Sequence, residues 1–150
     1  MSHSPPSLPA PPGETTLNEG RCYFRLAGEF DPAALTTRLG VEPTEAWRRG
    51  ERNPGRDLPR CSLWKFGVAD VRAEVVDIEA MSLAVVTPLE PSAAAIAEAA
   101  RDWDLHVSLV VALYFSPDER LSTPIVVFPP RVIAFLAQVG GCIDVDTYLL

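Results

Sequence analysis

The feature that most constrains how this chain folds is a helix whose two ends are both marked in the sequence. Asp31 can accept hydrogen bonds from the free amides of the first turn, and its charge suits the positive end of the helix dipole. Pro32 follows at the first helical position, where a missing N–H group costs nothing. Gly40 can take the left-handed conformation that ends a helix. The sequence therefore predicts a helix over residues 32–39.

The segment after this helix is extended and then becomes rich in arginine. The residue before Pro43 avoids helical angles, so the chain leaves the helix in an extended form. Thr44 is placed to cap a further short turn, against which Trp47 can pack. Between Arg48 and Lys65 there are six basic and two acidic residues. We call residues 48–60 the arginine loop.

Alternating strands are expected on either side of the helix and the arginine loop. Residues 22–27 alternate between apolar side chains and a mixed set, which is the period of a half-buried strand. Residues 62–68 alternate in the same way, with Trp64 on the apolar side. We expect ordered structure to begin at Arg21.

The second half of the chain predicts further helices and strands. They are a helix from about Ile78 that Pro88 ends, a helix from Pro91 or Ser92 to Trp103, a strand over 105–115, a short strand over 124–128, a helix over 131–139 and a strand over 143–149. The longest strand, 105–115, is expected at the centre of the sheet. The order β-α-β-α-α-β-β-α-β predicts a two-layer α+β sandwich, in which a largely antiparallel sheet of about five strands carries helices on one face.

Length and composition predict one domain behind an N-terminal tail. Residues 1–20 hold five of the fifteen prolines and few apolar side chains, so we expect a disordered tail. The remaining residues, 21–150, are enough for a single globular domain with its own core. The net charge of −7 argues against nucleic acid and anionic membranes as partners, since both favour basic surfaces.

The cysteines favour a reducing compartment and no metal. Cys22, Cys61 and Cys142 are odd in number and widely spaced, and no CxxC or Cys/His ligand spacing is present. A cytoplasmic location without a metal or other cofactor is the simplest expectation. Neither a signal peptide nor an apolar stretch long enough to span a bilayer is predicted.

Three separated segments resemble a bacterial protein family. They are YFRLAGEFDPAALTTRLGVEPTEAWRRGE from Tyr23, SLWKF from Ser62, and FPPRVIAFLAQVGGCIDVDTY from Phe128. In these segments the chain is similar to the family known as domain of unknown function 4279, over roughly residues 23–148. The resemblance implies a small bacterial protein and supplies no catalytic residues. The proline-rich tail is a departure, because it is not expected in the shared domain.

The arginine loop is one candidate binding site. Arginine presents a planar fork that binds carboxylate and phosphate groups through two hydrogen bonds. Trp47 and Trp64 bracket the loop, where their rings could stack on a guanidinium group or a ligand. Three alternatives remain open: the arginines pair with the chain's own carboxylates, including Asp144 and Asp146; they meet an acidic partner; or they hold a phosphate-bearing ligand. The candidate residues are Arg48, Arg49, Arg52, Arg56, Trp47 and Trp64.

A second candidate site follows from the alternation of the strands. If helices cover one face of the sheet, the other face carries a mixture of tyrosine and charged side chains. Tyrosine and arginine are favoured at protein–protein interfaces, so this mixture suits binding better than catalysis. The predicted face contains Tyr23, Arg25, Lys65, His106, Ser108, Tyr114, Asp144, Asp146 and Tyr148.

Two features of this face, the Asp144–Asp146 pair and His106, could also serve catalysis or bind a metal. The sequence gives no further support for these roles. Asp144 and Asp146 project from one side of the last strand, about 6.6–6.8 Å apart along it. Such a pair can bind a cation, share acid–base work, pair with arginine or face solvent, but no further oxygen ligands follow at motif spacing. His106 has no local partner motif. GxSxG, P-loop, GxGxxG and HExxH motifs are absent.

These features favour a non-enzymatic, cytoplasmic binding module whose partner is a protein. Neutralising that partner, as an immunity protein neutralises a toxin domain, is one form of this role. The alternative is a small-ligand-binding protein or an enzyme that acts on a phosphorylated or carboxylated compound at Arg48–Arg60. A deep pocket beside Trp47 and Trp64 would favour the alternative, and a flat, open sheet would favour the first hypothesis.

Overall fold

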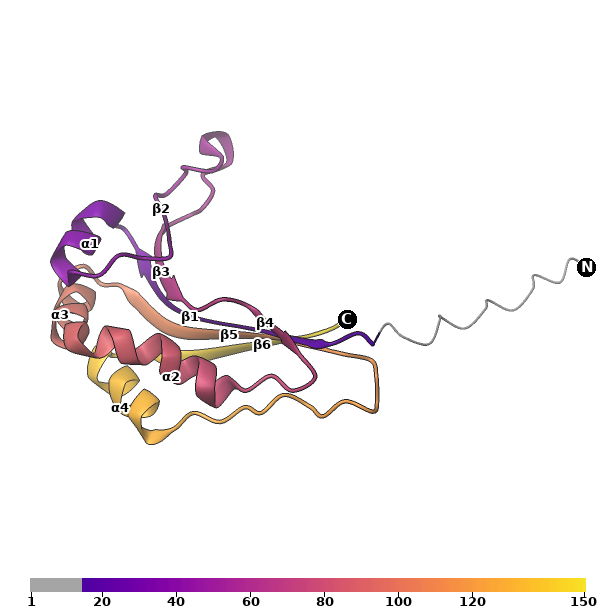
Figure 1. Ribbon diagram of the computed structural model, residues 1–150. Helices are drawn as coiled ribbons and strands as arrows, with labels where there is room; N and C mark the ends of the chain where they lie inside the picture. Colours follow the sequence, from indigo (N-terminus) through magenta and orange to yellow (C-terminus); the bar gives the residue numbers. More distant parts are fainter. Residues whose placement is uncertain (1–14) are drawn as a thin grey trace, which may run out of the picture.

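The chain forms a sheet with helices on one face, as Figure 1 shows for the computed structural model. The structure describes residues 15–150. In chain order the elements are β1 (Asn18–Gly28), α1 (Pro32–Leu39), β2 (Glu45–Trp47), β3 (Ser62–Gly67), β4 (Val71–Ala73), α2 (Ile78–Leu89), α3 (Ala93–Asp102), β5 (His106–Phe115), α4 (Pro130–Val139) and β6 (Cys142–Leu149). The predicted α+β class with a mostly antiparallel sheet is confirmed.

Strands β1 and β5 form the middle of the sheet. Within residues 15–150 the sheet has six strands in the order β2-β3-β1-β5-β6, and β4 pairs with the start of β1. The pairing of β5 with β6 is parallel, and the other pairings are antiparallel. Since β5 has a neighbour on each side, the predicted central position of the 105–115 strand is confirmed.

The predicted helix caps are both present in α1. Asp31 Oδ1 accepts a hydrogen bond from the Ala33 amide at 3.0 Å, and Gly40 ends the helix with a φ of 68°. Leu35 and Leu39 are buried, so α1 packs one side against the core. The helix therefore sets where the chain enters β2.

The core lies between the helices and one face of the sheet. Every second side chain of β1 and β3 points into it, and Phe24, Trp64 and Leu109 are fully buried. The rings of Phe24 and Phe135 meet edge to face, with centroids 5.6 Å apart, which joins β1 to α4. Burial on one side leaves the opposite face of the sheet outside the core.

The start of the ordered region differs from the prediction. β1 begins at Asn18 rather than Arg21, so residues 18–20 of the predicted tail belong to the sheet. Their backbone pairs with β4 and β5, which an alternation of side chains does not reveal. Residues 1–14 of the predicted tail lie outside the described residues.

The short turn predicted after Thr44 is wrong. Thr44 Oγ1 donates to the carbonyl of Lys65 at 3.2 Å and accepts from the amide of Gly67 at 3.1 Å. The residues after it therefore form β2 on the edge of β3 instead of a turn. β4 is also absent from the sequence prediction, because three residues are too few to show a period.

In the second half of the chain, one predicted helix end and one predicted strand are also wrong. Pro88 lies inside α2, and a 3₁₀ turn over Glu90–Ser92 joins α2 to α3. Pro88 has no backbone N–H to donate, so α2 loses one helical hydrogen bond near its end. The burial of Val85 and Leu89 offsets this loss. Residues 124–128 form no strand, because only an isolated bridge between Ile125 and Asp77 is present there.

One apolar segment is longer than predicted, since the sequence was expected to contain none long enough to span a bilayer. By length and composition alone, Ile78–Asp102 is apolar enough to cross a membrane, because an 18-residue window within it has a mean hydropathy of 1.3. In the structure this segment is α2, the 3₁₀ turn and α3, and it places Val85, Leu89 and Ile96 in the core. A helix that packs in a core passes such a test as readily as one that spans a bilayer.

Asn18 holds three separate segments together at the start of β1. Its side chain donates to the carbonyl of Glu74 at 2.8 Å and to that of Ser122 at 2.9 Å. Its Oδ1 accepts from the amide of Ser116 at 2.8 Å. Because Asn18 is only 2% exposed, no water can replace these bonds without local opening.

Replacing Asn18 with alanine should lower the free energy of unfolding by about 2–4 kcal/mol, because buried backbone groups lose their partners. Urea unfolding measures the loss. Thr37→Ala is the matched control, since the exposed Thr37 hydroxyl bonds only the Ala33 carbonyl of its own helix. The control should change stability by less than about 0.5 kcal/mol. An unchanged unfolding midpoint in Asn18→Ala would contradict the structural role.

Candidate functional site

The sheet face that carries no helix is the candidate site, and we call it the open face. Because side chains alternate along a strand, the strand registers fix which residues lie on it. One row across the sheet joins Lys65 of β3, Arg25 of β1, Ser108 of β5 and Cys142 of β6. By the same alternation the face also carries Arg21, Tyr23, His106, Tyr114, Asp144, Asp146 and Tyr148.

Arg25 lies at the centre of the open face and is only partly paired. Its Nη2 atom is 3.9 Å from Asp144 Oδ2, which is a long ion pair. The Nε of Arg25 and the Oγ of Ser108 are buried and have no hydrogen-bond partner in the described part of the chain. Buried polar groups without partners are unfavourable.

Aromatic rings cover much of the rest of the face. Tyr114 and Tyr148 stack with centroids 4.9 Å apart and an angle of 19° between the rings. The guanidinium carbon of Arg21 lies 5.7 Å from the Tyr114 ring centroid, and Lys65 Nζ lies 4.9 Å from that of Tyr23. These contacts hold the rings and cations in fixed positions on rigid strands.

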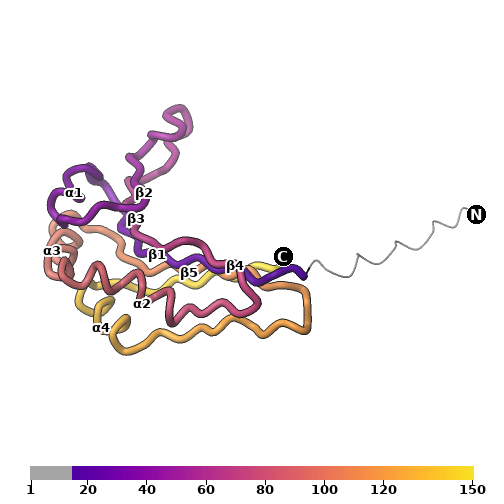
Figure 2. The backbone as a smooth tube through the Cα atoms, viewed as in Figure 1, coloured from indigo at the N-terminus to yellow at the C-terminus, as the bar shows by residue number. Residues whose placement is uncertain are grey.

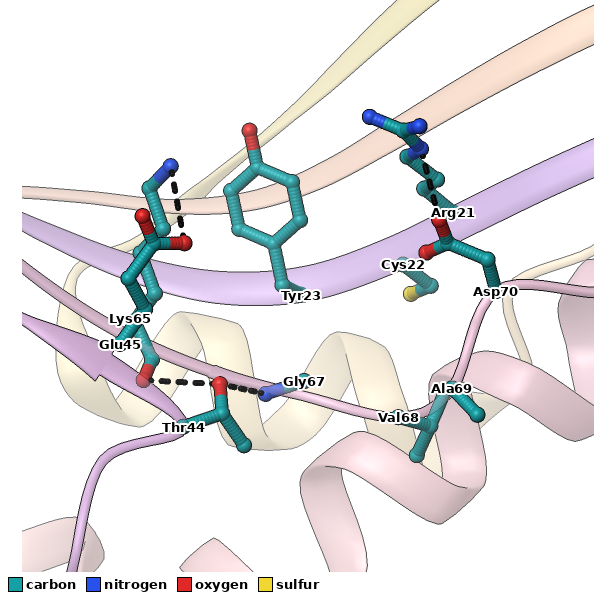
Figure 3. A pocket seen from close by; sticks show the side chains of 10 residues that line it. All are labelled: Arg21, Cys22, Tyr23, Thr44, Glu45, Lys65, Gly67, Val68, Ala69 and Asp70. Carbon is teal, nitrogen blue, oxygen red and sulfur yellow. Dashed lines mark hydrogen bonds and ion pairs between the residues drawn. The ribbon is translucent and has the colours of Figure 1, made fainter.

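A shallow groove of about 530 Å³ runs over the β1 side of the face. Figure 3 shows the Tyr23 ring between two ion pairs, with its hydroxyl pointing away from the strand. Arg21 Nε lies 3.0 Å from Asp70 Oδ2 on one side, and Lys65 Nζ lies 4.0 Å from Glu45 Oε2 on the other. Both cations in the groove therefore already have a carboxylate partner.

The groove depends on a glycine opposite Tyr23. A Cβ atom on Gly67 would lie 2.8 Å from the Cβ of Tyr23 and 3.1 Å from the carbonyl oxygen of Cys22. A side chain there would push against the β1 backbone. Gly67 therefore leaves the space that the Tyr23 ring uses.

The surroundings of Tyr23 raise the pKa of its hydroxyl above the ordinary value of 10.0. Burial is the main cause, and the carboxylates of Asp146, Asp144 and Glu45 add to it. The positive charge of Arg25 acts in the opposite direction. Tyr23 therefore keeps its proton and can donate a hydrogen bond from the centre of the groove.

The histidine and cysteines do not form a catalytic arrangement with a third group. His106 Nε2 lies 4.0 Å from Cys142 Sγ at the exposed ends of β5 and β6. Burial raises the pKa of the Cys22 thiol to about 12, so Cys22 remains a neutral core side chain. Within residues 15–150, no three His, Cys, Asp or Glu side chains lie close enough together to hold a metal ion.

The arginine loop belongs to a hairpin of β2 and β3 that stands out from the body. In Figures 1 and 2 the hairpin rises on the side of the sheet away from α2 and α4. Trp47 pairs with Leu63 at its base, and the Arg52 guanidinium lies 4.9 Å from the Trp47 ring centroid. Because Leu63 alternates with the buried Trp64, Trp47 lies on the side of the open face. The hairpin and the open face are therefore continuous.

Two arginines of the loop are held by carboxylates of the chain itself. Arg48 Nη2 lies 2.8 Å from Asp31 Oδ1, the same oxygen that caps α1. Arg49 binds both oxygens of Asp57, with its Nη2 at 2.7 Å from Oδ2, and holds the pKa of that carboxyl below its usual range. Its Nη1 also lies 3.1 Å from Glu29. These pairs fix the base of the hairpin.

The alternative in which the loop pairs with Asp144 and Asp146 is not found among the described residues. Asp31, Glu29 and Asp57 lie closer to the loop and take Arg48 and Arg49. Arg25, from β1, is the arginine that approaches Asp144.

Trp64 cannot stack on a ligand at the surface, contrary to the expectation from its position beside the loop. It is fully buried, and its Nε1 donates to Thr36 Oγ1 at 3.1 Å. The alternation of β3 already placed Trp64 on the apolar side of the strand, and the tertiary structure shows that this side of β3 faces α1.

The structure adds residues that the sequence did not single out. Arg21, Glu45 and Asp70 line the groove around Tyr23. The alternation of β1 could have placed Arg21 on the face with Tyr23. Asp70 lies in the connection between β3 and β4 and had no periodic signal.

A family model described as "Domain of unknown function (DUF4279)" matches residues 17–150. The chain belongs to the DUF4279 family. The match covers β1 to β6, so the open face and the hairpin both lie within the family domain. No curated protein and no solved structure matches the chain.

The charges of the open face should move the pKa of Tyr23 in opposite directions. Arg25→Gln should raise it further, because the opposing positive charge is lost, and Asp144→Asn/Asp146→Asn should lower it toward 10.0. NMR titration of ¹³C-labelled tyrosines resolves Tyr23 from the other rings. Since the folded pKa exceeds the unfolded one, stability should fall as the pH rises above about 10. Shifts in the same direction in both variants would contradict this arrangement.

Proposed function

We propose that this protein is a non-enzymatic module of the bacterial cytoplasm that binds another protein through its open face and hairpin. The observation that carries the proposal is the stacked Tyr114–Tyr148 pair, together with Tyr23 and Arg25, on a sheet face without helices. Tyrosine and arginine are the residue types that contribute most at protein interfaces. Rigid strands hold them in place, so binding loses little side-chain entropy.

The exposed arginines of the hairpin favour a partner that carries acidic side chains. Arg52, Arg56 and Arg60 are exposed and form no ion pair within residues 15–150. Arg48 and Arg49 stiffen the base of the hairpin, so these three cations project from a fixed support. Complementary charge mainly speeds association and selects the partner. Neutralising a partner, such as a toxin domain, is one form that this role can take.

A small-ligand site at the arginine loop has less support. Arg48 and Arg49 already bind carboxylates of the chain, and Trp64 lies in the core. Ligand sites are typically concave and leave a few convergent polar groups free. The groove around Tyr23 is shallow, and its cations already have carboxylate neighbours: Arg21 is closely paired at 3.0 Å, and Lys65 has a long contact at 4.0 Å. The free cysteines Cys22, Cys61 and Cys142 agree with a reducing compartment.

The proposal is tested by comparing the proteins captured by matched variants. The immobilised wild-type chain is exposed to a lysate of its source bacterium, and captured proteins are identified by mass spectrometry. Tyr23→Ala/Tyr114→Ala removes rings from the open face, and Arg56→Gln/Arg60→Gln removes charges from the hairpin. Glu98→Gln/Arg101→Gln, on the exposed side of α3, is the control. Thermal unfolding of each variant confirms that it folds.

One protein should be captured by the wild type and the control and lost with the tyrosine variant. The hairpin variant should bind that protein more weakly, with a smaller dependence on salt. Retention of every captured protein by the folded tyrosine variant would contradict a binding role for the open face.

A further inference from the structure

Strand β6 is a long edge of the sheet that has no second neighbour among the described residues. It runs from Cys142 to Leu149 and pairs with β5 on one side. An edge strand presents a row of unpaired N–H and C=O groups to solvent, which another chain can extend. Natural edges are often protected by charged side chains, above all lysine, by proline or by a bulge, and Asp144 and Asp146 are the charged side chains of β6. Residues 142–149 contain neither lysine nor proline.

The backbone of β6 indicates which peptide groups face outward. The amide of Leu150 donates to the carbonyl of Phe115 at 3.0 Å, directly after the end of β6. Along a strand the N–H and C=O groups of successive residues point to opposite sides. The even-numbered residues of β6 therefore face β5, and the N–H and C=O groups of Ile143, Val145 and Thr147 point away from the sheet.

The two sides of this edge differ in chemistry. On the helix side, Ile143 is 38% exposed and Val145 is 41% exposed, although both side chains are apolar. Beside Ile143, a groove of about 320 Å³ is lined by Ile133, Leu136, Ala137 and Gly141. On the open-face side lie the carboxylates of Asp144 and Asp146, each one residue from an exposed apolar side chain.

We propose that β6 binds an extended segment of a partner protein in which basic and apolar side chains alternate. The segment adds a strand to the sheet by hydrogen bonds to the outward groups of Ile143, Val145 and Thr147. Its basic side chains lie beside Asp144 and Asp146 on the open-face side. Its apolar side chains lie beside Ile143 and Val145 and extend the apolar groove on α4. Residues directly opposite in neighbouring strands are close enough for these pairs.

The carboxylates of β6 are available for such a segment. Asp146 forms no ion pair within residues 15–150, and the pair of Asp144 with Arg25 is long, at 3.9 Å. Residues 142–149 contain two acidic and no basic side chains. A segment that carried acidic side chains at these positions would instead be repelled.

The same carboxylates argue against a second copy of this chain as the occupant. In an antiparallel pair of two β6 strands about a twofold axis, opposite residues share a face of the sheet. Centring the pair on Val145 places Asp144 opposite Asp146 of the second copy, twice. Centring it on Asp144 or Asp146 places that carboxylate opposite its own copy. Like charges directly opposite one another destabilise a sheet. In the registers that pair most of β6, the charge pattern therefore favours a basic partner over self-association.

This inference rests on the proposed function only in that the partner is a protein, and it names the segment that β6 recognises. The edge is tested separately from the open face, because a change at Thr147 leaves Tyr23 and Tyr114 in place. Thr147→Pro removes an outward N–H and no hydrogen bond to β5, so the fold tolerates it. Thr147→Ala is the matched control, since it keeps that N–H.

The probe is a phage-displayed library of random peptides, selected on the wild-type chain and counter-selected on Thr147→Pro. Enriched sequences should alternate basic and apolar residues, and synthetic copies should shift the β6 amide signals in ¹⁵N NMR spectra. Their Kd should rise at least about tenfold in Thr147→Pro and stay unchanged in Thr147→Ala. Asp144→Asn/Asp146→Asn should also weaken binding and reduce its salt dependence. Asp144→Lys/Asp146→Lys should select acidic peptides instead.

Three results of the peptide selection would overturn the proposal. They are enrichment of peptides without the alternation, equal affinity of the enriched peptides for Thr147→Pro and the wild type, and failure of the library to yield any peptide that depends on β6. A wild-type dimer in sedimentation that Thr147→Pro dissociates would assign the edge to a second copy. If a cellular partner is lost with Tyr23→Ala/Tyr114→Ala but retained by Thr147→Pro, the open-face role stands and the edge role fails.

Discussion

The pairing of β1 with β5 is the interaction on which the rest of the structure depends. These two strands share a long antiparallel register, and their apolar sides bury Phe24 and Leu109 against the helices. Burial of one sheet face supplies most of the free energy of such a two-layer domain. Every other strand is placed by reference to this pair, since β3 and β4 extend β1, and β6 extends β5. The same pairing forces the remaining side chains of both strands onto a single uncovered face.

The side chains on that uncovered face support the proposed role in recognition. Rings and cations are held against one another across strands, as in the Tyr114–Tyr148 stack, and the groove around Tyr23 is shallow with its cations paired. The Nε of Arg25 and the Oγ of Ser108 are buried without a hydrogen-bond partner near the centre of the face, within the described part of the chain. The hairpin adds exposed arginines at one end of the face. The acidic edge strand β6 lies at the other end, so a partner meets opposite charges at the two ends.

This distribution of charge favours one orientation of a partner that covers the open face. A partner that covers the open face would place acidic groups near the hairpin and basic groups near β6, because each end repels the opposite arrangement. The net charge of −7 alone would suggest only a basic partner. The arrangement in space is more selective than the composition.

The sequence by itself determined most of the local elements and, for the strands that it predicted, which residues lie on each face of the sheet. Asp31 and Gly40 marked the ends of α1, and the period of two separated Tyr23 and Arg25 from Phe24 before any neighbour was known. The tertiary structure alone decided the start of β1 at Asn18, the β2 strand after Thr44 and the ion pairs of the arginine loop. Those features depend on backbone hydrogen bonds and on carboxylates distant in sequence, such as Glu29 for Arg49. Periodicity reports which side of an element is apolar, but it carries no information on which segments become neighbours.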